Sequence, residues 1–277
     1  MSVAASLFPA GLGPGAAGDP GVIGPGGTVW RVGREKALLA GGPTALLLQV
    51  AHPAVAAGVV DHSDFESDPV GRLRRTLDTM LTVGFGDRVQ AEAAVAAVAA
   101  VHVPVRGPSY RADDPELALW VHATLVLTAL GAFENFVGRL SDDEKADYYE
   151  RYKVVGRMFG VTDEVMPATY ADFVAYVRRM EEEVLAVGDQ ARAVAAGIFG
   201  AKVTGPTWLT RPAMELAAGG LLPASLRRDY GIPWGRGRRG AYAVVRRLVR
   251  PAVHLLPARA RYWQHYRAAR SRISPAE

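Results

Sequence analysis

Residues 44–60 read TALLLQVAHPAVAAGVV, and this stretch decides the fold class. Apart from Gln49 and His52 it is apolar on every side, which is typical of a helix buried in a protein core. Glycine and proline signals separate it from further stretches with helical patterns, while the alternation typical of strands is essentially missing. We therefore expect an all-α fold, a single globular domain of about ten helices. The other predicted helices lie at residues 34–39, 70–83, 88–103, 116–140, 170–187, 189–199 and 212–218, with one more capped by residues 141–144 and two near the C-terminus.

The N-terminal segment differs from this helical body. Residues 1–27 are rich in glycine and proline and carry almost no charge, so we expect a flexible arm followed by one helical domain at residues 28–277. No basic segment precedes the first apolar residues and Pro9 interrupts them early, so we expect no signal peptide and a cytoplasmic protein. The chain has no cysteine, which excludes thiolate nucleophiles and cysteine-ligated iron or zinc.

Positive charge is concentrated near the C-terminus. The net charge is only +4, but residues 227–272 contain thirteen arginines and a single acid, Asp229. One interpretation is peripheral contact with an anionic membrane surface; specific nucleic-acid binding is not expected. The other is a solvated, arginine-rich helical surface with no partner.

His102 is the histidine whose position best suits metal ligation. It continues the helical stripe of Val95 and Val98 at spacings of three and four, on a helix rich in alanine. Pro104 ends that helix, so His102 lies in its last turn, where the helix dipole raises the basicity of an imidazole. A strong neutral nitrogen donor suits iron, although the small residues are equally suited to tight helix packing.

Two further histidines have structural explanations of similar weight. His52 shares a helix face with Gln49, and its structural interpretation is a core histidine that bonds to a backbone carbonyl or to Gln49 as a ready partner. His122 follows Trp120 in another apolar helix and fits either a group beside a cofactor or a packed core residue.

Arg72, Arg75 and Thr76 form a second polar cluster. Their spacings place them on one helix face, and two neighbouring guanidinium groups repel each other unless an anion lies between them. The anion is either a ligand carboxylate, such as a haem propionate, or a side chain of the neighbouring loop. The acidic residues of that loop are Asp61, Asp64, Glu66 and Asp68.

Several blocks of the sequence resemble a family once classified as a domain of unknown function. This family contains the catalytic domains of rubber oxygenase (latex-clearing protein) and of the fungal oxygenase of mycophenolic acid biosynthesis. The Ala-His-Pro block at residues 51–53 and the Trp-Val-His-Ala-Thr block at residues 120–124 are its most specific features, and the similarity extends over about residues 28–235. The other similar positions are Trp30, Glu35, His62, Asp68, Arg72, Thr76, Phe85, His102, Tyr110, Asp114, Tyr148, Gly156, Pro167 and Trp234.

The resemblance implies a set of roles. Family members are all-α, bind one b-type haem in an internal pocket and cleave carbon–carbon double bonds of isoprenoid chains with dioxygen. His102 resembles the proximal iron ligand, and Arg72 and Thr76 resemble the Arg-x-x-x-Thr pair beside the haem. Arg75 stands where rubber oxygenases have a lysine that caps the iron, and a guanidinium cannot ligate a metal because it keeps its proton.

The sequence thus predicts a b-type haem-dependent oxygenase that uses dioxygen on a hydrophobic small or medium-sized substrate. The expected iron ligand is His102, the expected catalytic residues are Arg72 and Thr76, and Arg75, His52 and His122 are further candidates beside the haem. A non-catalytic haem carrier or sensor, and a haem-free helical protein that binds lipid, are the alternatives.

Overall fold

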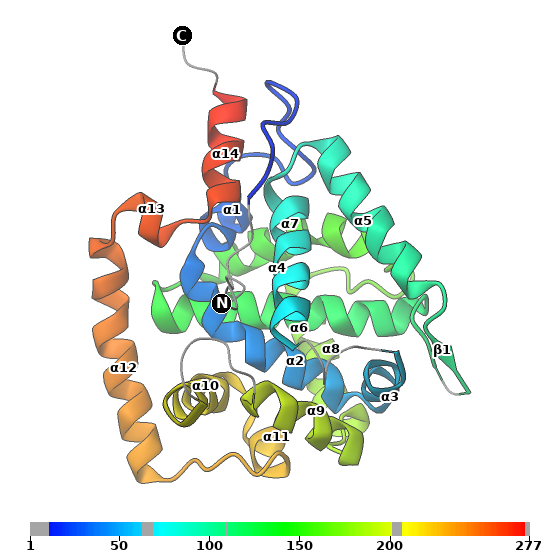
Figure 1. The fold of residues 1–277 in the computed structure, drawn as a ribbon, viewed down its shortest axis with the longest axis vertical. Coiled ribbons are helices and arrows are strands. Elements are labelled where there is room, and N and C mark those ends of the chain that lie inside the picture. Colours follow the sequence, from blue (N-terminus) through cyan, green and yellow to red (C-terminus); the bar gives the residue numbers. More distant parts are fainter. Residues whose placement is uncertain (1–10, 63–68, 109, 201–206, 275–277) are drawn as a thin grey trace, which may run out of the picture.

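The computed structural model describes residues 11–62, 69–108, 110–200 and 207–274, and this part of the chain is almost entirely helical (Figure 1). It forms one all-α domain, as predicted, with fourteen α-helices, one 3-10 helix (η1), one π-helical turn (η2) and one pair of two-residue strands. The elements are α1 (Gly27–Gly33), η1 (Lys36–Gly41), α2 (Gly42–Ala51), α3 (Pro53–His62), α4 (Pro69–Phe85), α5 (Arg88–His102), β1 (Arg106–Gly107), β2 (Tyr110–Arg111), α6 (Pro115–Phe136), α7 (Asp142–Met158), α8 (Tyr170–Arg179), η2 (Met180–Val184), α9 (Asp189–Gly200), α10 (Thr207–Leu221), α11 (Ala224–Asp229), α12 (Arg236–Leu255), α13 (Ala258–Arg261) and α14 (Gln264–Ile273).

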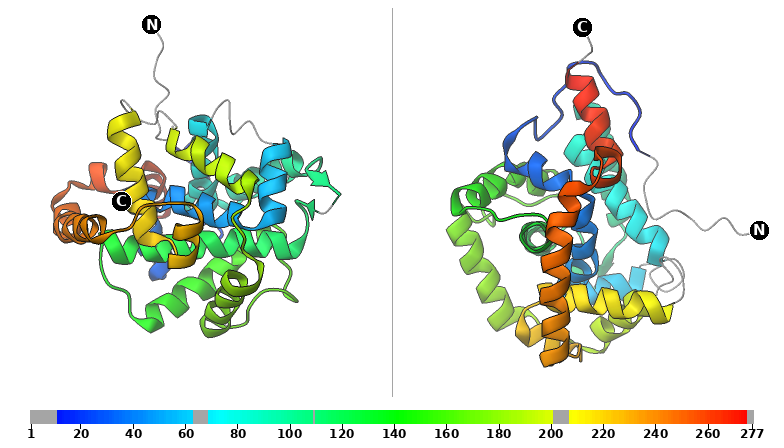
Figure 2. Two further views of the ribbon diagram at one scale, coloured as in Figure 1. Left: turned by 90° about the horizontal axis from the view of Figure 1, so that it is seen from below. Right: turned by 90° about the vertical axis from the view of Figure 1, so that its left-hand side faces the viewer.

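Helix α6 is the centre of the fold. It crosses the molecule and is packed by η1, α2, α7 and α12 (Figures 1 and 2). Trp120, Ala123 and Val126 on this helix are fully buried, and Trp120 Nε1 donates a hydrogen bond to the Leu48 carbonyl of α2 at 3.1 Å. By length and composition α6 is also apolar enough to cross a membrane, but 56% of its most apolar window is buried inside this domain.

The prediction of one continuous helix over residues 44–60 is wrong. Helix α2 ends at Ala51, α3 begins at Pro53, and the chain bends there by 105°. His52 between them has an extended backbone, with φ −78° and ψ 119°. Pro53 is the physical cause, because a proline disfavours helical dihedrals in the residue before it and has no N–H to continue the helix.

Several predicted helix starts are confirmed by their caps. The Asp114 carboxylate accepts from the backbone N–H of Glu116, and Ser141 and Glu144 form a reciprocal capping box. A similar box at Asp87 starts α5, directly after the two-residue turn that follows α4.

Other boundaries differ from those predicted. Helix α6 ends at Phe136 rather than residue 140, the segment 170–187 is divided between α8 and η2, and α10 continues through Pro212. A small antiparallel hairpin, β1–β2, follows α5 where no strand was expected. The number of helices exceeds ten because of the break at His52 and the short helices near the C-terminus.

Residues 11–26 contain no helix or strand and lie against the turn between α4 and α5. The Ala16 N–H donates to the Asp87 carboxylate at 2.7 Å, and Arg272 of α14 donates to the carbonyls of Asp19 and Phe85 at 2.9 and 3.0 Å. The remainder of the segment expected to be a flexible arm, residues 1–10, lies outside the described residues.

A buried ion pair connects the start of the domain to its C-terminal helices. Glu35 is only 1% exposed, and its two carboxylate oxygens accept from Nε and Nη2 of Arg261, each at 2.8 Å. This bidentate contact holds α13 against η1. Helix α12, which precedes α13, lies along one outer edge of the molecule (Figures 1 and 2).

Candidate functional site

A cavity of about 250 Å³ lies between α4 and the helices α1, α2, α6 and α7. Its α4 wall is a single helix face, which carries Arg72 and Thr76 among leucines and a methionine. The prediction that Arg72 and Thr76 share a helix face is therefore confirmed. The facing walls are mostly apolar, and their polar side chains include Gln49 of α2, Thr128 of α6, and Tyr148 and Tyr152 of α7.

The two tyrosines belong to a feature whose role the sequence analysis did not identify. Tyr148, Tyr152 and Gly156 recur every four residues, so they lie on one face of α7. Tyr148 stacks on Tyr152 with ring centroids 5.3 Å apart, and burial raises the pKa of both phenols. They remain neutral at physiological pH and form an aromatic wall of the cavity. The spacing of four was visible in the sequence, but it does not say which way the face points.

Arg72 and His102 lie at the same end of the α4–α5 pair. The chain reverses direction at residues 86–87, so the end of α5 lies on the same side of the helix pair as the start of α4. Desolvation by burial lowers the pKa of His102, and the positive charge of Arg72 lowers it further. The imidazole is therefore neutral at pH 7, which is the form that ligates a metal.

The surroundings of His102 differ from those expected. Val95 and Val98 are half-buried, but His102 itself is exposed and does not line the 250 Å³ cavity. Nearby protein atoms nonetheless desolvate the imidazole enough to lower its pKa. The end of α5 extends beyond the packed part of the helix, which explains the exposure.

Arg72 carries the charge on the cavity wall. Desolvation lowers its pKa and the adjacent Arg75 lowers it further, yet a guanidinium keeps its proton under all physiological conditions. Arg75 and Thr76 are exposed, and of these two only Thr76 lines the cavity. The cavity is thus open to solvent near Thr76, and Arg75 lies outside its wall.

His52 has a structural role that differs from the prediction. Its Nδ1 accepts from the backbone N–H of Ala54 at 3.2 Å, so it caps the start of α3. The expected partner, Gln49, instead donates to Thr124 Oγ1 at 3.0 Å. The hydrogen bond predicted between His52 and Gln49 is wrong because the chain bends between them. Neither His52 nor His122 lines the cavity.

His122 is buried behind the tyrosine wall. It is 4% exposed and stacks on Tyr152 with centroids 5.3 Å apart and planes 17° apart. Burial lowers its pKa to about 4, so it is neutral at pH 7. Gly156 permits this packing, because a Cβ there would lie 3.2 Å from the ring and 2.8 Å from Met166 Cε.

The acidic residues that follow α3, which are candidates for the anion beside Arg72 and Arg75, lie only partly within the described residues. Asp61 accepts a hydrogen bond from the Tyr110 hydroxyl at 2.7 Å, which raises the pKa of Tyr110 to about 12. This contact joins α3 to β2, and Asp61 does not line the cavity. Asp64, Glu66 and Asp68 lie outside the described residues.

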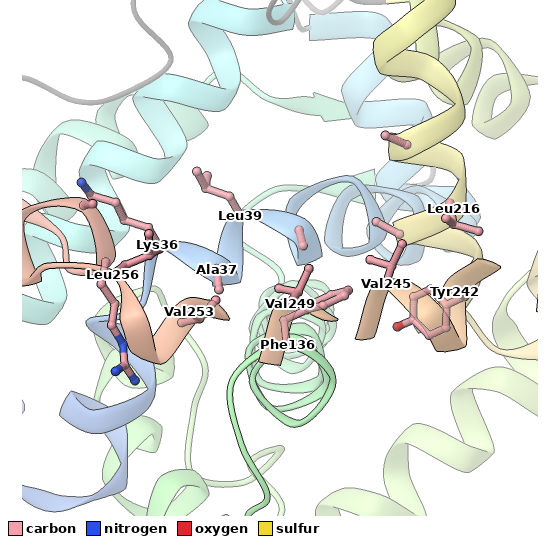
Figure 3. A pocket seen from close by; sticks show the side chains of 15 residues that line it. Lys36, Ala37, Leu39, Phe136, Leu216, Tyr242, Val245, Val249, Val253 and Leu256 are labelled. Atoms are coloured by element: carbon pink, nitrogen blue, oxygen red, sulfur yellow. The ribbon is translucent and has the colours of Figure 1, made fainter. Parts of the chain in front are cut away.

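A second cavity, of about 520 Å³, lies between η1, α10 and α12 (Figure 3). Its lining is almost wholly apolar, with Lys36 at one end and Tyr242 at the other. Leu39 of η1 lines this peripheral cavity and also the cavity beside α4. The two spaces are therefore separated by η1.

The side chains of Arg72 and His102 are of the types that could hold a haem. A porphyrin supplies four ligands itself and needs one neutral imidazole, which His102 offers, and its propionates are natural partners for an arginine. Trp30 lines the cavity, and its buried Nε1–H has no hydrogen-bond partner among the described residues. Within the same residues, no group of three or more His, Asp or Glu side chains is arranged to hold a metal ion.

Comparison with known proteins defines the class of enzyme. Residues 30–251 match the family described as "ER-bound oxygenase mpaB/B'/Rubber oxygenase, catalytic domain". The chain belongs to this family and is therefore an oxidoreductase of the oxygenase class, which confirms the resemblance predicted from the sequence blocks.

Individual relatives are distant. The uncharacterized proteins Mb2261 of Mycobacterium bovis and Rv2237 of Mycobacterium tuberculosis are each 26% identical to the chain over 231 residues, which is 78% of this chain and 88% of each relative. No solved structure gives a significant match.

Proposed function

We propose that the protein is a b-type haem-dependent oxygenase that uses dioxygen to oxidise a hydrophobic small or medium-sized molecule. The observation that carries the proposal is the position of Arg72 and His102 at one end of the α4–α5 pair, beside an apolar cavity, in a chain of an oxygenase family. The His102 imidazole suits the iron, and the Arg72 guanidinium suits a propionate.

Each residue has a distinct task in this proposal. Haem iron would supply the binding and activation of dioxygen. His102 would hold the iron through its neutral imidazole, and Arg72 would bind a propionate or place positive charge beside the reacting oxygen. Thr76 would donate a hydrogen bond on the same face of α4, while Arg75 would add positive charge outside the cavity wall.

The apolar walls support a hydrophobic substrate. Tyr148 and Tyr152 line the cavity beside α4, and their neutral phenols favour apolar contact and the exclusion of water. The peripheral cavity offers further apolar space across η1, and at about 520 Å³ it has the size of ordinary small-molecule sites.

The proposal is tested on protein expressed with a haem precursor. We expect a Soret band, haem that acid acetone extracts because the chain has no cysteine to attach it, and dioxygen uptake when apolar candidate substrates are added. A Soret band without uptake for any substrate would favour a haem carrier or sensor. A colourless protein that also fails to bind added hemin would contradict the proposal and favour a lipid-binding protein.

A further inference from the structure

Helix α12 exposes an unusual amount of apolar surface. Of the ten large apolar side chains that are exposed in the described part of the chain, five belong to this helix or to the residue directly after it. Leu248 is 64% exposed and Leu255 85%. The five are Val244, Val245, Leu248, Leu255 and Leu256.

Most of these exposed apolar side chains form a continuous strip along α12. Val244, Leu248 and Leu255 are separated by four and seven residues, so they lie along one side of the helix, and the exposed residues Ala241 and Ala252 extend the same side. The strip adjoins the face of α12 that packs on the domain, where Tyr242 and Val253 are buried. Val245 and Leu256 lie between the two faces and line the peripheral cavity (Figure 3).

The remaining side of α12 is strongly basic. The helix contains six arginines and no acidic residue, and Arg236, Arg239 and Arg247 are exposed. Arg238 forms an ion pair with Glu215 of α10, and it is the only one of the six that pairs with an acid within the described part of the chain. Helix α13 adds Arg259 and Arg261, the second of which is neutralised by Glu35.

The exposed apolar strip and the adjacent arginines together indicate one kind of partner. An apolar strip beside arginines is the pattern of a helix that lies in the surface of a membrane, with the leucines among the acyl chains and the guanidinium groups at anionic headgroups. A second copy of the chain would bring six more arginines against these six, which is unfavourable. A nucleic acid would match the charge but would leave the exposed leucines without apolar contact.

We propose that α12 docks the protein onto an anionic lipid bilayer through the strip Val244–Leu248–Leu255 and its flanking arginines. The position of α12 on the outer edge of the molecule leaves this side free of other described elements (Figures 1 and 2). Docking in this orientation brings the exposed residues Val245 and Leu256, which line the peripheral cavity, close to the lipid surface. The inference concerns binding alone and does not depend on the presence of haem.

Vesicle co-sedimentation of the full chain tests this docking. We expect binding to vesicles of phosphatidylcholine with 30% phosphatidylglycerol, little binding to phosphatidylcholine alone, and weaker binding at high salt. The double variant Leu248→Ser/Leu255→Ser should reduce binding more than tenfold. Its melting temperature should not change, because both side chains are exposed.

Two exposed valines of α5 provide a matched control. Val89 and Val101 are 70% and 68% exposed and lie far from α12 in the sequence, so Val89→Ser/Val101→Ser should bind vesicles like the wild type. Equal loss in both double variants, or no loss in the α12 variant, would overturn the assignment of the docking face. Absence of vesicle binding, together with a dimer that the α12 variant converts to monomer, would show that the strip joins two copies instead.

Discussion

Replacing His122 with phenylalanine should make the stability of the protein less sensitive to acid. The substitution keeps an aromatic ring against Tyr152 and removes only the group that titrates. In the wild type, burial lowers the pKa of His122 from 6.5 to about 4, while the unfolded chain keeps the ordinary value. Between these two values the unfolded state binds the proton and the folded state does not.

The sign and size of the effect follow from that difference. The contribution of His122 is fully present above pH 6.5 and is lost as the pH falls toward 4, because protonation then favours the unfolded chain. From about pH 7.5 to about pH 4.5 the loss amounts to about 2.5 kcal/mol of the free energy of unfolding. Other groups also titrate in this window, so the quantity to compare is the difference between wild type and variant.

Urea unfolding of the wild type and of His122→Phe at about pH 7.5 and about pH 4.5 measures this difference in stability. We expect the wild type to lose about 2.5 kcal/mol more than His122→Phe on acidification, again as an order of magnitude. A substitution at the exposed His62, His62→Gln, should follow the wild type. Parallel losses in wild type and His122→Phe would refute the reasoning, because they would mean that His122 is protonated in the fold or lies in contact with water.

Three further predictions concern the cavity and the packing around it. Arg72→Ala should weaken haem retention in hemin titrations while helix content by circular dichroism stays the same, whereas Arg75→Ala should retain haem because Arg75 lies off the cavity wall; equal loss in both would contradict this site. Gly156→Val should lower the free energy of unfolding by about 1–3 kcal/mol in urea, since its side chain must displace a packed imidazole; unchanged stability would argue against that close packing. Glu35→Gln should lower the free energy of unfolding by about 3–5 kcal/mol, because the buried charge of Arg261 is left without its carboxylate partner. A loss below about 1 kcal/mol would show that the ion pair is open to water.

The sequence predicted the fold class because its signals are local. The capping residues Asp114 and Ser141 and the apolar surface of the central helix specify helices without reference to the rest of the chain. The break at His52 is also a local signal, since Pro53 follows it directly, but apolar residues on both sides give the stretch the pattern of one continuous buried helix. The length of α6 was predicted too long because Val137 and Leu140 extend the apolar pattern past Phe136, where the helix ends.

The candidate site was predictable only in part, since it depends on how the helices pack. The shared face of Arg72 and Thr76 follows from their spacing of four. The proximity of Arg72 to His102 depends on the turn between α4 and α5, and periodicity alone does not give the direction in which a helix end points. For the same reason the exposure of His102 and the tyrosine wall of α7 could not be read from the sequence.

The visible absorption spectrum of His102→Ala, purified with added haem precursor, tests the central claim most directly. We expect this variant to lose the Soret band of the wild type and added imidazole to restore part of it by taking the position of the missing ligand. His52→Ala and His122→Ala should keep the band, because His52 caps α3 and His122 is stacked behind Tyr152. A His102→Ala protein with the wild-type spectrum would contradict the account and move the iron ligand to another histidine.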